Sequence, residues 1–231
     1  MPSLSDAASP DFAAARRNMV EGQLRPNNVT DSRILAAMGE IPRELFVPST
    51  LVGVAYGDDE VPLVSGRFLM SPLVLARLMQ AAEIGQGDHV LELAPATGYS
   101  TLVLAALSSS IVSVEPDALL HREAEKNSAA HAAGKVKVLA GAPVESCVSH
   151  APFDVIFING SVEFLPQILF DQLAEGGRLA VVVRSYGAAR AAHVGQARLY
   201  RKIKGDISWI ALFEAHASLA PGFAALRGFE F

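Results

Sequence analysis

The chain has 231 residues with a formal net charge of −5, and 51% of the residues are hydrophobic. This length suits one domain with a sizeable core, and an acidic balance without a basic stripe argues against nucleic-acid binding. The single cysteine, Cys147, rules out an intrachain disulfide and fits a reducing compartment, so we expect a cytoplasmic protein. No apolar run approaches the about 20 residues of a membrane span. Residues 1–12 have no basic start and no apolar core, so they predict a disordered lead-in rather than a signal peptide.

The first 70 residues predict a helical extension. Residues 11–50 read as helices, and Thr30 or Asp31 is a suitable N-cap for the second of them. Residues 51–70 lack a clear period and read as a loop with short strands. We therefore expect an N-terminal extension over residues 1–70 and a Rossmann-like unit over residues 71–231, which together form one compact whole.

From Ser71 onward, apolar strands alternate with helices. Ser71 followed by Pro72 indicates a helix start. Strands are predicted at 89–93, 111–115, 136–140, 153–159 and 177–184, and helices at 98–108, 117–132 and 163–173. This pattern indicates an α/β fold with a doubly wound, mostly parallel sheet covered on both faces. Two further β-like runs, 197–203 and 208–215, predict an antiparallel hairpin at the edge of the sheet.

A loop and an acidic residue have the spacing of a nucleoside site. Ligands of open α/β sheets bind at the carboxyl ends of the strands, where the strand order reverses, and loop 94–98 is the expected position. A helix that begins near Gly98 directs free N–H groups toward an anionic group. Glu115 ends the next strand, 21 residues after Ala94, close to the about 20 residues expected before a ribose-binding acid. Taken alone, Glu115 also reads as a solvated residue or a helix cap.

Five segments share the pattern of a known enzyme family. They are MVEGQLRPNNVTDSRILAAMGEIPRELFVP, VLELAPATGYSTLVLAAL, VSVEPD, APFDVIFINGS and LAEGGRLAVVV, within residues 18–185. With these segments the chain resembles the protein-L-isoaspartate O-methyltransferases. The resemblance implies a Rossmann-like sheet and S-adenosylmethionine as cofactor, with S-adenosylhomocysteine as product. It also implies methylation of a carboxylate, either on isoaspartyl residues of damaged proteins or peptides or on a related acid. The oligomeric state stays open between a monomer and a homo-oligomer.

The resemblance also assigns site residues. The cofactor-binding positions are Ala94, Ala96, Thr97, Gly98, Tyr99, Glu115 and Ala142. Met70 and Ser71 fall on the catalytic substrate segment, although Ser71 also reads as the N-cap of the next helix. The substrate cleft is formed by Arg67, Phe68, Asn159, Gly160 and Ser161. Arg184 leaves the fifth strand at the same edge, and we expect it to be solvated rather than paired with a substrate carboxylate. No metal site is expected, because the six histidines have no metal-binding spacing.

The departures from the family pattern fall on functional positions. Ala94 and Ala96 replace glycines, Met70 replaces a serine, and Ala142 replaces an acid. An alanine that must adopt positive φ costs about 1–2 kcal/mol, and we expect cofactor affinity to be about ten- to a thousandfold lower. Three interpretations stay open: an isoaspartyl-type methyltransferase with weakened or altered activity, a methyltransferase with a different acceptor, and a catalytically inactive binding protein on this fold.

Overall fold

The computed structural model describes residues 11–132, 134–184 and 194–225. Residues 1–10 of the predicted lead-in lie outside this part. Within it, no helix is both long and apolar enough to cross a membrane.

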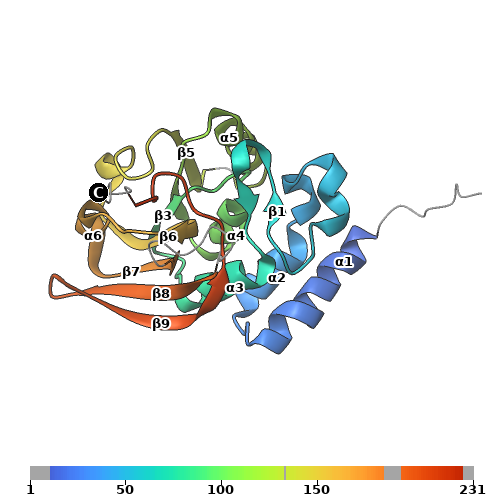
Figure 1. Cartoon of the computed structure of the whole chain (residues 1–231), viewed down its shortest axis with the longest axis horizontal. Coiled ribbons are helices and arrows are strands. Elements are labelled where there is room, and N and C mark those ends of the chain that lie inside the picture. The colour runs from blue at the N-terminus through green and yellow to red at the C-terminus, as the bar shows by residue number, and fades with distance from the viewer. Residues whose placement is uncertain (1–10, 133, 185–193, 226–231) are drawn as a thin grey trace, which may run out of the picture.

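The N-terminal residues form helices that pack beside the sheet (Figure 1). Helix α1 (Phe12–Met19) continues into a π-helical turn over Val20–Leu24, and α2 (Ser32–Glu40) follows. The carboxylate of Asp31 accepts the N–H of Arg33, so Asp31 is the N-cap of α2. Arg43–Phe46 and Ser49–Val54 form 3₁₀ helices, and the expected short strands are β1 (Val61–Pro62) and β2 (Phe68–Leu69), which pair as an antiparallel hairpin.

A seven-stranded sheet forms the centre of the molecule. Its strands are β3 (His89–Leu93), β4 (Ser110–Glu115), β5 (Val136–Ala140), β6 (Phe153–Val162), β7 (Leu173–Val183), β8 (Val194–Ile203) and β9 (Asp206–His216). Their spatial order is β5-β4-β3-β6-β7-β8-β9. The first five are parallel, and β8 and β9 join as the predicted antiparallel hairpin. The strand order reverses at β3, which confirms the predicted switch point and the doubly wound fold.

The helices that connect the strands are α3 (Pro72–Ala81), α4 (Tyr99–Leu107), α5 (Ala118–His131) and α6 (Gln167–Asp171). Helix α6 is shorter than the predicted 163–173, because β6 runs on to Val162 and Pro166 comes directly before the helix. Glu163 donates its backbone N–H to the carbonyl of Phe223 rather than starting a helix.

Alternate residues of the strands face two different cores, as expected for a sheet covered on both sides. Val155 and Phe157 of β6 belong to one cluster, together with Leu24 and Met38 of the N-terminal segment. Ile156 and Ile158 of β6 belong to the second cluster, with Leu169, Leu173 and Phe223. The N-terminal segment therefore shares its core with one face of the sheet.

The residues after β9 return across the carboxyl end of β6, a feature that the sequence did not predict. Figure 1 shows this segment running from the end of β9 back toward α6. Ser161 donates its N–H to Ser218 O at 2.8 Å and accepts the N–H of Ala220 at 2.8 Å. The side chain of Phe223 is fully buried. We name residues 217–223 the C-terminal strap.

Candidate functional site

The loop after β3 has the backbone conformation of a glycine-rich loop. Ala94 and Ala96 have φ values of 63° and 56°, and Gly98 has a φ of 90°. Glycine adopts such values without strain, whereas an alanine carries a Cβ that crowds the backbone there. Helix α4 starts directly after Gly98, and no side chain caps its first N–H groups. The predicted loop-and-helix geometry is therefore present, with two strained alanines in it.

We expect the strain at Ala96 to show in a comparison of two alanine-to-glycine substitutions. Ala96 and Ala76 are both fully buried, and Ala76 lies in α3. Ala76→Gly should lower the unfolding free energy by about 1.5–2 kcal/mol through lost methyl burial and helix propensity. Ala96→Gly loses the same methyl group but relieves about 1–2 kcal/mol of backbone strain, so it should be nearly neutral. Urea denaturation measures both, and equal losses would contradict the strain at Ala96.

Glu115 stands at the tip of β4 and faces this loop. Its Oε2 accepts the N–H of Ala96 at 2.8 Å, and its Oε1 accepts the N–H of Asp117 at 3.1 Å. The residue is fully buried. The carboxylate thus ties loop 94–98 to the start of α5, and it lies on the neighbouring strand tip as the 21-residue spacing predicted.

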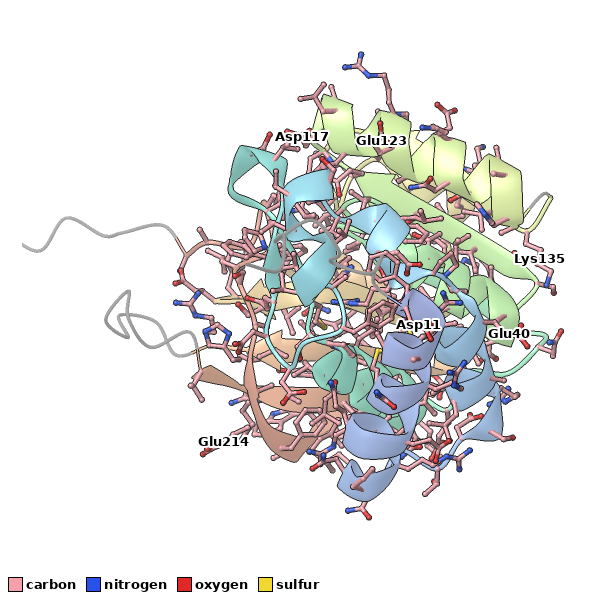
Figure 2. All side chains as sticks on the ribbon, turned by 90° about the vertical axis from the view of Figure 1, so that its right-hand side faces the viewer. Asp11, Glu40, Asp117, Glu123, Lys135 and Glu214 are labelled. Carbon is pink, nitrogen blue, oxygen red and sulfur yellow. The ribbon has the colours of Figure 1, made fainter. Side chains whose placement is uncertain are left out.

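Arg67, predicted in the substrate cleft, reaches into the same place. Its Nη1 lies 2.6 Å from Glu115 Oε1, and its Nη2 donates to Ala94 O at 2.9 Å. The side chain is only 10% exposed in this ion pair. Arg67 follows a tight turn in which Ser65 and Gly66 have positive φ. Figure 2 shows the segment with β1 and β2 beside Asp117 at the start of α5.

An S-adenosyl cofactor can be tested against this arrangement. The left-handed loop and the uncapped start of α4 suit the anionic group of such a cofactor, and a carboxylate at the tip of β4 suits its ribose. Arg67 occupies Oε1, one of the two carboxylate oxygens that could accept from ribose hydroxyls. The backbone frame therefore fits the cofactor, and the guanidinium of Arg67 is the conflict within it.

A buried polar cluster lies behind the loop, and sequence analysis missed its central residue, Glu92. Ser100, Thr101 and Ser113 donate hydroxyl hydrogen bonds to the Glu92 carboxylate, and Asn159 donates to Ser100 Oγ at 2.8 Å. Burial raises the pKa of Glu92, while these hydrogen bonds act in the opposite direction. The available signal was an acid within an otherwise apolar strand. The cluster fixes the first turn of α4 against β3.

Arg43 is a second residue that sequence analysis missed. It is fully buried, and its Nε and Nη2 donate to Ala55 O and Met70 O, each at 2.6 Å. Its guanidinium carbon lies 4.8 Å from the ring centroid of Tyr99. Burial lowers the pKa of Arg43 and raises the pKa of Tyr99 to about 12. Arg43 therefore holds the backbone of the predicted substrate segment against α4.

The other predicted residues of the substrate segment and loop lie in different surroundings. The Met70 side chain is 2% exposed within the core. Ser71 Oγ accepts the N–H of Val74, so Ser71 caps α3. Phe68 is 37% exposed. Thr97 donates its hydroxyl to Phe46 O at 2.8 Å.

The remaining predicted residues lie at two further places along the same sheet edge. Ala142 follows β5, and Asn159, Gly160 and Ser161 lie near the end of β6. Ala142 is exposed in the loop after β5. Asn159, Gly160 and Ser161 are buried. Ser161 Oγ donates to Ala217 O at 2.8 Å beneath the C-terminal strap. The structure thus brings Arg67, Ala94, Ala96 and Glu115 into one contact group, whereas Ala142 stays outside it.

The prediction that Arg184 is solvated is wrong. Arg184 is only 7% exposed, and its backbone N–H donates to Val162 O at 2.8 Å. Gly195 at the start of β8 packs so closely that a Cβ there would lie 3.1 Å from Arg184 Cγ. Because β8 runs back along β7, it covers Arg184, which the sequence pattern placed at an open strand end. Ser185 and Tyr186, which follow it, lie outside the described residues.

Known proteins support the assignment to a family. The family model "Protein-L-isoaspartate(D-aspartate) O-methyltransferase (PCMT)" matches residues 15–216. The protein-L-isoaspartate O-methyltransferase of Koribacter versatilis is 38% identical over 182 residues, which cover 78% of this chain and 82% of that protein. The enzyme of the same name from Methylorubrum extorquens is 33% identical over 215 residues, covering 92% of this chain and 94% of that protein.

Solved structures agree. A protein-L-isoaspartate O-methyltransferase superposes with a TM-score of 0.76 at 25% identity, over 90% of this chain and 67% of the other. A Plasmodium falciparum protein described in the same way, in complex with S-adenosyl-L-homocysteine, superposes with a TM-score of 0.72 at 18% identity over 92% of this chain and 99% of its own, which supports the fold. The resemblance seen in the five sequence segments is thereby confirmed, and the chain belongs to the protein-L-isoaspartate O-methyltransferase family.

Proposed function

We propose that this protein transfers a methyl group from S-adenosylmethionine to the carboxylate of isoaspartyl residues in damaged proteins or peptides, and that it acts in the cytoplasm. The observation that carries the proposal is the left-handed loop 94–98 facing Glu115, in a chain of this family. The curated relatives carry the name of this activity.

Methyl transfer to a carboxylate depends mainly on how the methyl group and the acceptor are positioned. The cofactor supplies the methyl group, and the acceptor carboxylate is already ionised at neutral pH, so no general base is required. The protein must hold the two groups close and aligned. In this proposal, the loop at Ala94–Gly98 and the N–H groups at the start of α4 hold the cofactor, and Glu115 accepts from its ribose hydroxyls. Residues 67–71 form the acceptor side.

Met70 is expected to lower the rate of methyl transfer. Its side chain is buried and provides no hydroxyl for the acceptor carboxylate, while its carbonyl is held by Arg43. A hydrogen bond to a charged group contributes about 1.5–3 kcal/mol, which corresponds to about one to two orders of magnitude in rate. We therefore propose a reduced turnover compared with relatives that carry a serine at this position.

The experiment supplies an isoaspartyl peptide and S-adenosylmethionine labelled on its methyl group, and counts labelled methanol released from the methyl ester. An aspartyl peptide of the same sequence is the matched control. We expect label to depend on the isoaspartyl linkage, and Glu115→Ala to lower it at least about tenfold, because the hydrogen bonds to a charged carboxylate are lost. If the wild-type protein releases no more label than Glu115→Ala, the proposed activity does not exist.

A second candidate is a binding protein that does not use the cofactor. The ion pair between Arg67 and Glu115 favours it, because the acid expected at the ribose is already paired within the chain. Calorimetry with S-adenosylmethionine and with its demethylated product distinguishes the two candidates. Binding of both compounds at micromolar concentration excludes the cofactor-free form.

A further inference from the structure

We propose that Arg67 controls whether the carboxylate of Glu115 is available to the adenosyl cofactor. This inference rests on the function proposed above. In the structure Arg67 bridges two parts of the cofactor site at once, since it contacts Glu115 at the tip of β4 and Ala94 O in the loop after β3. A cofactor whose ribose binds Glu115 must first displace this guanidinium.

The hydrogen bonds of Glu115 show why Arg67 is the donor that has to leave. A carboxylate has about four acceptor positions. The backbone N–H groups of Ala96 and Asp117 occupy two of them, and both belong to elements that frame the site. The third donor is the side chain of Arg67. With Arg67 in place only one position remains, which is too few for two ribose hydroxyls. Removing Arg67 frees a second position, on Oε1, and leaves the loop attached to β4.

Val61 of β1 and Leu69 of β2 are buried in the core, so the part of this hairpin that is free to move is the turn at residues 64–67. Strands β1 and β2 form an isolated hairpin with only two residue pairs. The turn between them is closed locally, by Leu63 N–H to Arg67 O and Arg67 N–H to Val64 O. Val64 is 48% exposed and Phe68 is 37% exposed. This turn can move away from Glu115 without breaking the seven-stranded sheet, which is the property expected of a lid.

The side chain of Arg67 holds the turn at residues 64–67 against the tip of β4. There, Glu115 also accepts the N–H of Asp117, which caps the start of α5. Opening must break a charge-assisted pair that is largely shielded from water, and the apparent cofactor affinity falls in proportion to the open fraction.

The test is calorimetric titration with S-adenosylhomocysteine of the wild-type protein, Arg67→Gln and Arg33→Gln. Arg33 is the matched control, because it also pairs with a carboxylate, that of Asp31, but on α2 away from the site. We expect Arg67→Gln to bind about 10–100-fold more tightly than wild type, the value of one hydrogen bond to a charged group. Arg33→Gln should bind as wild type does. An Arg67→Gln affinity equal to or weaker than wild type overturns the proposal.

Hydrogen–deuterium exchange without ligand gives a second, independent measurement. We expect the amides of residues 63–67 to exchange at least about tenfold faster in Arg67→Gln than in wild type or Arg33→Gln, because opening no longer breaks the ion pair. Unchanged exchange in this segment contradicts the lid.

The titrations separate the failure of this inference from the failure of the proposed function. If wild type and Arg33→Gln bind S-adenosylhomocysteine and Arg67→Gln gains nothing, the role of Arg67 fails while the cofactor site stands. If none of the three proteins binds it, the proposed cofactor function fails, and the control of access by Arg67 fails with it.

Discussion

Gly160→Ala is expected to lower the free energy of unfolding by about 3–5 kcal/mol, the sum of backbone strain and overpacking. Gly160 has a φ of 142°, which residues with a side chain rarely adopt. A Cβ there would lie 2.9 Å from Ser218 O and 3.1 Å from Ala220 Cβ. The closest of these atoms belongs to the backbone of the C-terminal strap, so relief requires the strap to move off β6. Thermal or urea unfolding measures the loss.

Gly176→Ala is the control for the strain alone. Gly176 has a φ of 77°, and a Cβ there would meet nothing within 4 Å. We expect this variant to lose only about 1–2 kcal/mol, the cost of a left-handed alanine. Limited proteolysis gives a second measurement, because Gly160→Ala should also expose the strap to cleavage. If both variants lose the same stability, the strap does not pack against Gly160 as described.

Arg43→Met is the second large effect, with an expected loss of about 2–4 kcal/mol of unfolding free energy. Methionine fills a similar apolar space but donates no hydrogen bond, so the carbonyls of Ala55 and Met70 are left unpaired in the core. Each unpaired buried group costs about 1–3 kcal/mol. Removing the buried cation offsets part of this loss of stability, because folding no longer has to desolvate a charge. The urea midpoint at an unchanged m-value measures the loss.

The matched control is Arg33→Met. Arg33 pairs with Asp31 at 2.6 Å, but its side chain is 44% exposed. Exposed pairs contribute about 0–1 kcal/mol, so this variant should remain close to wild type. An Arg43→Met protein as stable as Arg33→Met would show that the two carbonyls find other donors. In that case Arg43 does not hold the segment at Met70 in place.

The features that sequence analysis predicted are those with local signals. Apolar strands that alternate with helices, the proline after Ser71 and the spacing from Ala94 to Glu115 can all be read within a few tens of residues. The structure confirms the parallel sheet, its reversal at β3 and the edge hairpin. It also gives Ala94 and Ala96 the positive φ that the sequence analysis considered as a possible cost. The roles of the individual site residues stay predictions.

Other features depend on contacts between distant parts of the chain, and no local pattern reveals them. The sequence pattern placed Arg67 in the substrate cleft, yet its side chain pairs with a carboxylate 48 positions later. The burial of Arg184 depends on the return of β8, and the burial of Gly160 depends on the C-terminal strap. A guanidinium buried among carbonyls, as at Arg43, follows only from the way that the N-terminal segment packs on α4.

The amino-acid sequence by itself therefore determined the class of fold, the family resemblance and the place of the left-handed loop after β3, because periodicity and motif spacing are properties of short stretches of chain. Tertiary structure alone decided which charges meet at that loop. Long side chains such as arginine reach several ångströms from their own backbone, and a buried ion pair forms wherever folding brings its two partners together. Whether Glu115 accepts from a ribose or from Arg67 is thus settled by the packing of a short hairpin against the edge of the sheet.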